Sequence, residues 1–177
     1  MTSTSGTTKE QVENTADSSE GKIQLKLNSG SFYLPHPAKA KTGGEDAHFI
    51  CATTQAIGVA DGVGRWAYLV VLVIGLAWLR RKITVAPGDV LVAGTDGLFD
   101  NLYDADITGV VIRAVEDGLG PQMTAQKIAA LAQQRGMDQT KPSPFSDAAK
   151  EAGFEYHGGK LDDITVVVSY VTNNANL

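Results

Sequence analysis

The first strong pattern in the chain is an alternation of apolar and polar residues, which is the two-residue period of a half-buried β-strand. The apolar positions of this strand are Ile23, Leu25 and Leu27. Two apolar runs predict further strands over 47–51 and 55–60, and a loop with two prolines and a Gly-Gly pair separates them from the first strand. We therefore expect the first third of the chain to consist of strands joined by turns.

The pattern changes from strands to helices and back again in the second half of the chain. Apolar residues recur at helical spacing after a cap at Asp104 or Asp106, and glycines follow each helical stretch as typical stops. The predicted elements, in order, are strands over 83–86 and 90–93, helices over 104–117, 124–136 and 145–152, and a strand over 164–171. Strands, then helices, then a strand indicate an α+β fold with a mostly antiparallel sheet.

The segment 66–79 is unusual because it is apolar throughout. It reads WAYLVVLVIGLAWL, contains no charged residue and is followed by Arg80-Arg81-Lys82. A membrane-spanning helix needs about 20 apolar residues, and a run of about 10–14 is more often buried inside a protein. The basic flank would suit a membrane boundary, so a membrane anchor remains an alternative to the favoured buried strand or helix.

Composition narrows the chemistry that the chain can perform. A formal net charge of −5 argues against a nucleic-acid partner. The single cysteine, Cys51, excludes an internal disulfide and a cysteine-based zinc site, and the three histidines are too scattered for a histidine-rich site. Any metal would therefore be held by oxygen atoms, which favours magnesium, manganese or calcium.

Residues 1–21 predict a disordered tail, because they are rich in Ser and Thr and have no apolar segment. Several acidic residues and no arginine among the first 20 residues are unlike a signal or transit peptide, which favours a cytoplasmic protein. We expect one domain over 22–172, followed by a short tail over 173–177.

Four acidic sites share one setting, the junction between an apolar strand and a turn. Asp61 and Asp96 follow predicted strands, whereas Glu45 and Asp162 precede them. Carboxylates at strand ends can converge at one end of a sheet, and hard divalent cations need several such oxygens. Asp-Gly is also a common turn, so each site alone is more often structural. Together they predict an oxygen-liganded divalent metal site and leave the reaction open.

Four longer motifs resemble those of the metal-dependent protein phosphatases of type 2C. They read GGEDAHF (43–49), GVADGVG (58–64), GDVLVAGTDGLFDNL (88–102) and GGKLDDITVVVSYV (158–171). YLPHP (33–37) and SPFSDAAKEAGF (143–154) are similar to the small plant and mitochondrial branch. The resemblance covers about 23–67 and 83–171, and it implies a truncated four-layer αββα sandwich of mostly antiparallel sheets flanked by helices.

The resemblance also implies roles for individual residues. Asp61 is expected to bridge two Mg²⁺ or Mn²⁺ ions, with Asp46 holding water at the site and Lys41 in the place of an arginine that grips phosphate. The implied metal ligands are Glu45, Asp61, the Gly62 carbonyl, Asp96 and Asp162, with Asp163 in support. The implied reaction is hydrolysis of phosphoserine or phosphothreonine in a protein substrate by a metal-activated water, carried out by a monomer. Relatives of this branch are often in chloroplasts or mitochondria.

The chain departs from the family pattern most in its middle. The family has several strands and helices between the Asp-Gly-x-Gly turn and the strand before Asp96, where this chain has only the apolar run 66–79. Two smaller departures are Val63, where many members have histidine, and Arg65, where the pattern has glycine. Loss of interior strands leaves sheet edges without partners. The alternative is therefore a catalytically inactive metal-binding or interaction module, possibly membrane-tethered through 66–79.

Overall fold

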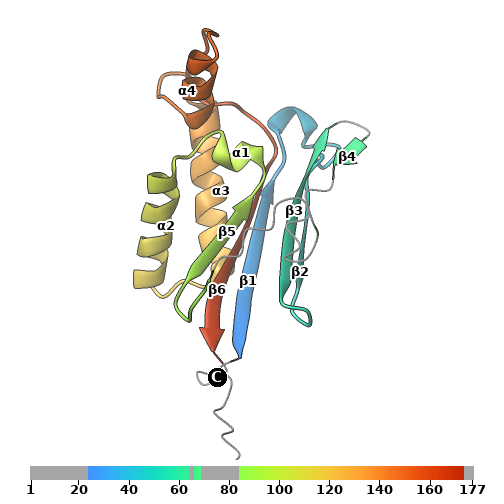
Figure 1. Cartoon of the computed structure of the whole chain (residues 1–177). Helices are drawn as coiled ribbons and strands as arrows, with labels where there is room; N and C mark the ends of the chain where they lie inside the picture. Colours follow the sequence, from blue (N-terminus) through green and yellow to red (C-terminus); the bar gives the residue numbers. More distant parts are fainter. Residues whose placement is uncertain (1–23, 64–65, 69–83, 174–177) are drawn as a thin grey trace, which may run out of the picture.

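The structure is a computed structural model that describes residues 24–63, 66–68 and 84–173. Two three-stranded antiparallel sheets, of order β1-β6-β5 and β2-β3-β4, pack face to face, with the longer helices on the outer side of the first (Figure 1). The strands are β1 (Leu25–Leu34), β2 (Ala47–Cys51), β3 (Ala56–Val63), β4 (Trp66–Tyr68), β5 (Val90–Gly94) and β6 (Ile164–Asn173). The helices are η1 (Pro37–Lys39), α1 (Asp96–Phe99), α2 (Asp104–Glu116), α3 (Pro121–Met137) and α4 (Pro144–Glu151).

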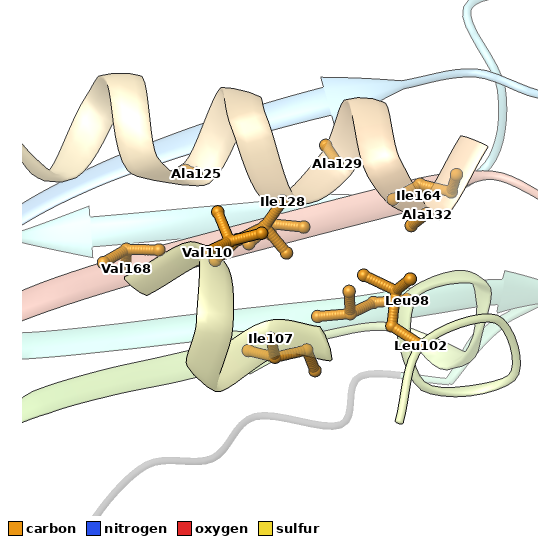
Figure 2. Close-up of a cluster of buried hydrophobic side chains, with 11 residues drawn as sticks. Leu98, Leu102, Ile107, Val110, Ala125, Ile128, Ala129, Ala132, Ile164 and Val168 are labelled. Carbon is orange, nitrogen blue, oxygen red and sulfur yellow. The ribbon is translucent and has the colours of Figure 1, made fainter. Parts of the chain in front are cut away.

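Strand β6 is buried on both faces and joins the two parts of the core. Val166 and Val168 belong to the cluster that also contains residues of α2 and α3, as Figure 2 shows for Val168, Val110 and Ile128. Val167 points to the opposite face and packs with Ile57 and other residues of the second cluster. Successive side chains of a strand face opposite sides, which explains the uninterrupted apolar sequence of β6.

Helix α3 lies close to the sheet because small residues form its buried face. Ala125, Ala129 and Ala132 are fully buried there with Ile128. On the facing strand, a Cβ atom on Gly30 would lie 2.3 Å from the backbone nitrogen of Gln122, so only glycine permits this approach. Pro121 begins the helix at a position where its missing N–H costs nothing.

The described residues form three layers: helices, a sheet and a second sheet. The prediction of an α+β fold with antiparallel sheets is confirmed. No described helix packs against β2, β3 or β4, so the second helical layer of the expected four-layer sandwich is absent from this part of the chain (Figure 1). Phe49 and Ile50 of β2 are accordingly 38% and 39% exposed.

Several element predictions need correction or lie outside the described residues. The predicted strand over 83–86 is not formed by Thr84–Ala86, where the chain leads directly into the turn at Gly88. The tail over 1–21 and most of the apolar run lie outside the described ranges, although Trp66–Tyr68 of that run form β4. Within those ranges, none of the helices has the length and apolar character required to cross a bilayer.

Candidate active site

Acidic residues from distant parts of the sequence gather at one end of the sandwich, the upper end in Figure 1. The pairing of Ala47 with Ala60 puts the start of β2 beside the end of β3, and that of Gly94 with Val166 puts the end of β5 beside the start of β6. The acidic residues there are Glu45 and Asp46 before β2, Asp61 in β3, Asp96 in α1, and Asp162 and Asp163 before β6. The antiparallel register thus brings the predicted strand-end carboxylates to the same end of the molecule.

The glycine of each Asp-Gly pair is required by a close backbone contact. A Cβ atom on Gly62 would lie 2.2 Å from the carbonyl oxygen of Glu45, and one on Gly97 would lie 2.0 Å from that of Asp163. The prediction of a turn at Asp61-Gly62 is wrong, because β3 continues through Val63 and pairs with β4. Likewise, Asp96 begins the one-turn helix α1. Both glycines allow one acidic segment to lie directly against another.

Gly62→Ala is expected to lower the free energy of unfolding by about 2 kcal/mol, because the added methyl group overlaps the Glu45 backbone. The matched control is Gly120→Ala, since Gly120 has an ordinary φ of −74° and nothing lies within 4 Å of an added Cβ. Gly120 is the N-cap of α3, where alanine is a poorer cap than glycine, so the control should cost no more than about 1 kcal/mol. Urea unfolding followed by circular dichroism measures both, and equal midpoints for the two variants would contradict the steric explanation.

Asp61 and Asp96 are hydrogen-bonded to each other through their carboxyl groups. Burial, with the hydrogen bond to Asp96 and its charge, raises the pKa of Asp61 to about 6. Burial works in the same direction on Asp96, but hydrogen bonds with Lys160 and Asp61 outweigh it and lower the pKa of Asp96. Adjacent negative charges on the two carboxylates repel each other, which favours the protonated form of Asp61. A bound cation would relieve the same repulsion.

Lys160 provides the positive charge nearest to this pair. Its Nζ atom lies 2.8 Å from Asp96 Oδ2, 2.8 Å from Asp100 Oδ2 and 3.0 Å from Asp162 Oδ2. Burial alone would lower the pKa of Lys160, but the three carboxylate contacts outweigh it and keep the pKa above its usual value. The side chain is therefore a cation fixed among acidic groups.

Asp46 is held by two threonine hydroxyls at the junction of the sheets. Thr95 Oγ1 and Thr165 Oγ1 donate to Asp46 Oδ2 at 2.7 and 2.9 Å, and both threonines are buried. Burial raises the pKa of Asp46, and the two hydroxyl bonds offset part of that rise. The Asp46 carboxyl is thus fixed in position by the ends of β5 and β6.

Asp163 organises the loop that carries Glu45. Its side chain is nearly fully buried and accepts hydrogen bonds from the backbone N–H of His36 at 2.6 Å and of Glu45 at 2.9 Å. Asp162, in contrast, is partly exposed, and its Oδ1 accepts from the backbone N–H of Asp163. The Asp163 carboxylate therefore binds backbone N–H groups, whereas the Asp162 carboxylate faces Lys160 and the acidic residues around it.

The predicted phosphate-gripping residue, Lys41, is exposed and forms no ion pair within the described ranges. Lys39 instead pairs with Glu45 at 2.5 Å and lies 3.6 Å from Asp163. Sequence reasoning assigned no role to Lys39, although it lies only two residues before Lys41. The structure therefore places a different lysine against the acidic group.

Sequence reasoning also assigned no role to three residues that lie in the site: Lys160, Asp100 and Asn101. Asn101 is buried and bonds to Lys160 twice, donating to its carbonyl at 2.7 Å and accepting from its N–H at 2.9 Å. Their positions in the sequence could have indicated a role in the site. Lys160 lies two residues before Asp162, and Asp100 lies four residues after Asp96 within one of the quoted motifs. A lone Asn among apolar residues is also typical of a buried polar anchor.

The side-chain chemistry fits a hard divalent cation, because carboxylates predominate at this end and the lysines there balance their charge only in part. In the described part of the chain, however, no three acidic, histidine or cysteine side chains converge into a ready metal site. The carboxylates instead bond to lysines, to threonines and to each other. The predicted roles of Glu45, Asp61, Gly62, Asp96 and Asp162 as metal ligands stay predictions.

Comparisons with known proteins agree with the geometry. No family model matches the chain. Among curated proteins, it is 40% identical to "Probable protein phosphatase 2C 55" of Arabidopsis thaliana, over 93% of this chain and 56% of that protein. It is 35% identical to "Probable protein phosphatase 2C 1" of Oryza sativa subsp. japonica, over 85% of this chain and 77% of that protein. Against two Arabidopsis relatives it spans only 56% and 60% of their length.

Several alignments are longer than the chain itself, that with "Probable protein phosphatase 2C 55" among them. That alignment extends over 263 positions, whereas the whole chain has 177 residues, so the Arabidopsis relative has residues inside the aligned region for which this chain has no counterpart.

The fold is similar to that of a solved structure, "X-ray structure of the photosystem II phosphatase PBCP", with a TM-score of 0.68. It covers 82% of this chain and 99% of that chain at 22% sequence identity, which shows a shared fold. The curated relatives and the shared α+β sandwich agree with the sequence motifs that frame the acidic end. The chain belongs to the type 2C protein phosphatase family.

Proposed function

We propose that the chain hydrolyses phosphoserine and phosphothreonine in protein substrates, using divalent cations at the acidic end of the sandwich. The observation that carries this proposal is the contact between Asp61 and Asp96, two carboxyls at an end of the molecule where acidic side chains outnumber the lysines that pair with them. Curated relatives named as protein phosphatases support the reaction class.

Two Mg²⁺ or Mn²⁺ ions would be held by side chains that already lie at this end. The proposed ligands are Glu45, Asp61, the Gly62 carbonyl, Asp96 and Asp162. Divalent cations bound there supply Lewis acidity, which activates water toward phosphorus and neutralises phosphoryl charge.

Other residues of the chain orient the reactants. The two threonine hydroxyls fix Asp46 through its Oδ2 atom, which leaves the other oxygen to orient a water molecule in this proposal. Lys39 and the exposed Lys41 give the neighbouring loop positive charge, which attracts a phosphorylated segment. Asp163 anchors that loop through two backbone N–H groups.

A second candidate function is a catalytically inactive phosphatase-like module that binds metal or another protein. The alignments longer than the chain favour it, because residues present in the relatives have no counterpart here. Among the described strands, β1 and β5 are edges that pair with β6 alone, so the sheet lacks neighbours that could hold the site more rigidly. A membrane tether through 66–79 could accompany either function, but it would require Trp66–Tyr68 to leave β4 and its pairing with β3.

The purified 177-residue chain is expected to release phosphate from a phosphothreonine peptide and to hydrolyse an aryl phosphate when Mn²⁺ is present. Activity should fall to background in EDTA and return when Mn²⁺ is added back, because the carboxylates alone offer no Lewis acid. A folded protein, verified by circular dichroism, that shows no turnover with Mn²⁺ or Mg²⁺ would favour the inactive module instead. Turnover that persists in EDTA would contradict the metal requirement.

A further inference from the structure

Lys160 lies at the centre of the acidic end. Its backbone is fixed, whereas its ammonium group lies at the end of a flexible side chain. Asn101 holds the Lys160 backbone through its N–H and its carbonyl. The ammonium group bonds Asp96, Asp100 and Asp162 and lies 5.4 Å from the centre of the Phe145 ring. Four side-chain torsions separate this fixed backbone from the ammonium group, so a divalent cation could displace the ammonium without moving the backbone.

The position of Lys160 conflicts with metal binding by the same oxygens. Asp96 Oδ2 and Asp162 Oδ2, on two proposed metal ligands, are the atoms that contact Lys160 Nζ at 2.8 and 3.0 Å. An ammonium and a divalent cation that share carboxylate oxygens repel each other strongly at such separations. Both cations cannot keep full contact with these two oxygens.

Two partners of Lys160 lie outside the proposed ligand set. Asp100 accepts from the ammonium at 2.8 Å, and the face of the Phe145 ring offers a cation–π contact. The Phe145 backbone N–H also donates to the Asp100 carbonyl at 3.0 Å, so both partners are held together. They provide a place for the ammonium after it leaves Asp96 and Asp162.

We propose that Lys160 is an internal counter-ion that holds Asp96 and Asp162 in the metal-free protein and gives them up to a divalent cation, keeping Asp100 as its partner. The inference rests on the proposed function, since it takes Asp96 and Asp162 as metal ligands. The opposing model makes Lys160 a permanent positioning residue that keeps both carboxylates aimed at the metal. The two models predict opposite signs for metal affinity when the charge is removed.

The test is Mn²⁺ binding by Lys160→Met and Lys160→Gln, measured from the electron paramagnetic resonance signal of free Mn²⁺. We expect each variant to bind Mn²⁺ about tenfold more tightly than the wild type, because the competing cation is gone. In EDTA, the melting temperature should fall by about 2–4 °C, since three carboxylates lose their shared partner. Saturating Mn²⁺ should remove that deficit.

The matched control is Lys141→Met, which removes an exposed lysine whose ion pair with Asp138 lies outside the acidic end, and it should leave Mn²⁺ affinity unchanged. Weaker or unchanged Mn²⁺ binding by a folded Lys160→Met or Lys160→Gln protein would overturn the counter-ion role. If the wild type itself binds no Mn²⁺, the proposed function and this inference both fail. Mn²⁺ binding by the wild type without the expected gain in the variants would overturn this inference alone.

Discussion

Asp61→Asn is expected to abolish Mn²⁺-dependent phosphatase activity while making the metal-free protein more stable. Loss of a residue that merely supports a metal ligand typically costs about 10–100-fold in activity, so loss of the proposed bridging ligand should cost more than about a hundredfold. The variant should nevertheless gain stability, because the pKa of Asp61 is raised to about 6 in the folded protein.

The sign follows from comparing folded and unfolded chains. An Asp whose folded pKa is raised contributes stability below its unfolded pKa, and that contribution disappears as pH rises through about 6. Above that pH, the ionised Asp61 carboxylate beside Asp96 opposes folding, and the neutral amide of Asn removes this opposition. The melting temperature in EDTA at pH 8 should therefore exceed that of the wild type.

Asp117→Asn is the control for this variant, because it makes the same chemical change at an exposed carboxylate at the end of α2. It should retain full activity and the wild-type melting temperature. If Asp61→Asn keeps more than about a tenth of wild-type activity with Mn²⁺, Asp61 is not a metal ligand.

Ile128→Ala is expected to lower the free energy of unfolding by about 3 kcal/mol. Ile128 is fully buried where α3 meets the sheet, in contact with a cluster that includes Val168 and Val110 (Figure 2). Truncation removes apolar contacts and leaves a cavity that the β6 backbone cannot easily fill. Urea unfolding followed by circular dichroism measures the change in the midpoint.

The same truncation on the exposed face of α2 is the control. Ile112 is 52% exposed, so Ile112→Ala should change the free energy of unfolding by less than about 0.5 kcal/mol. Comparable losses at both positions would mean that the packing between α3 and β6 does not carry the stability of the core.

The order and type of the longer elements could be predicted because periodicity reports burial directly. The α2 residues Ile107, Val110 and Ala114 are buried as their spacing required, and the β-branched run at 164–171 became β6. The helix over 145–152 was off by one residue, since Pro144 follows the capping residue Ser143. These predictions depend on local chemistry alone.

The contacts within the site could not be predicted, because they depend on how strands from distant parts of the sequence align. Nothing in the spacing shows that Lys160 reaches Asp96 or that Asp46 bonds to Thr95 and Thr165, 49 and 119 positions away in sequence. The glycines after Asp61 and Asp96 were attributed to turns, since sequence alone cannot show that another backbone passes beside them.

The central place of β6 has a consequence for how the protein is made. Strands β1 and β5 hydrogen-bond to β6 alone among the described strands, and residues Leu25–Leu34 pair with the segment that ends at Asn173. On the ribosome, β1 and β5 gain this neighbour only after residues 164–173 have been synthesised. Pairing across so many residues is intrinsically slow, and the waiting strands expose apolar surface. We expect a nascent chain of this design to need protection from aggregation until β6 has emerged.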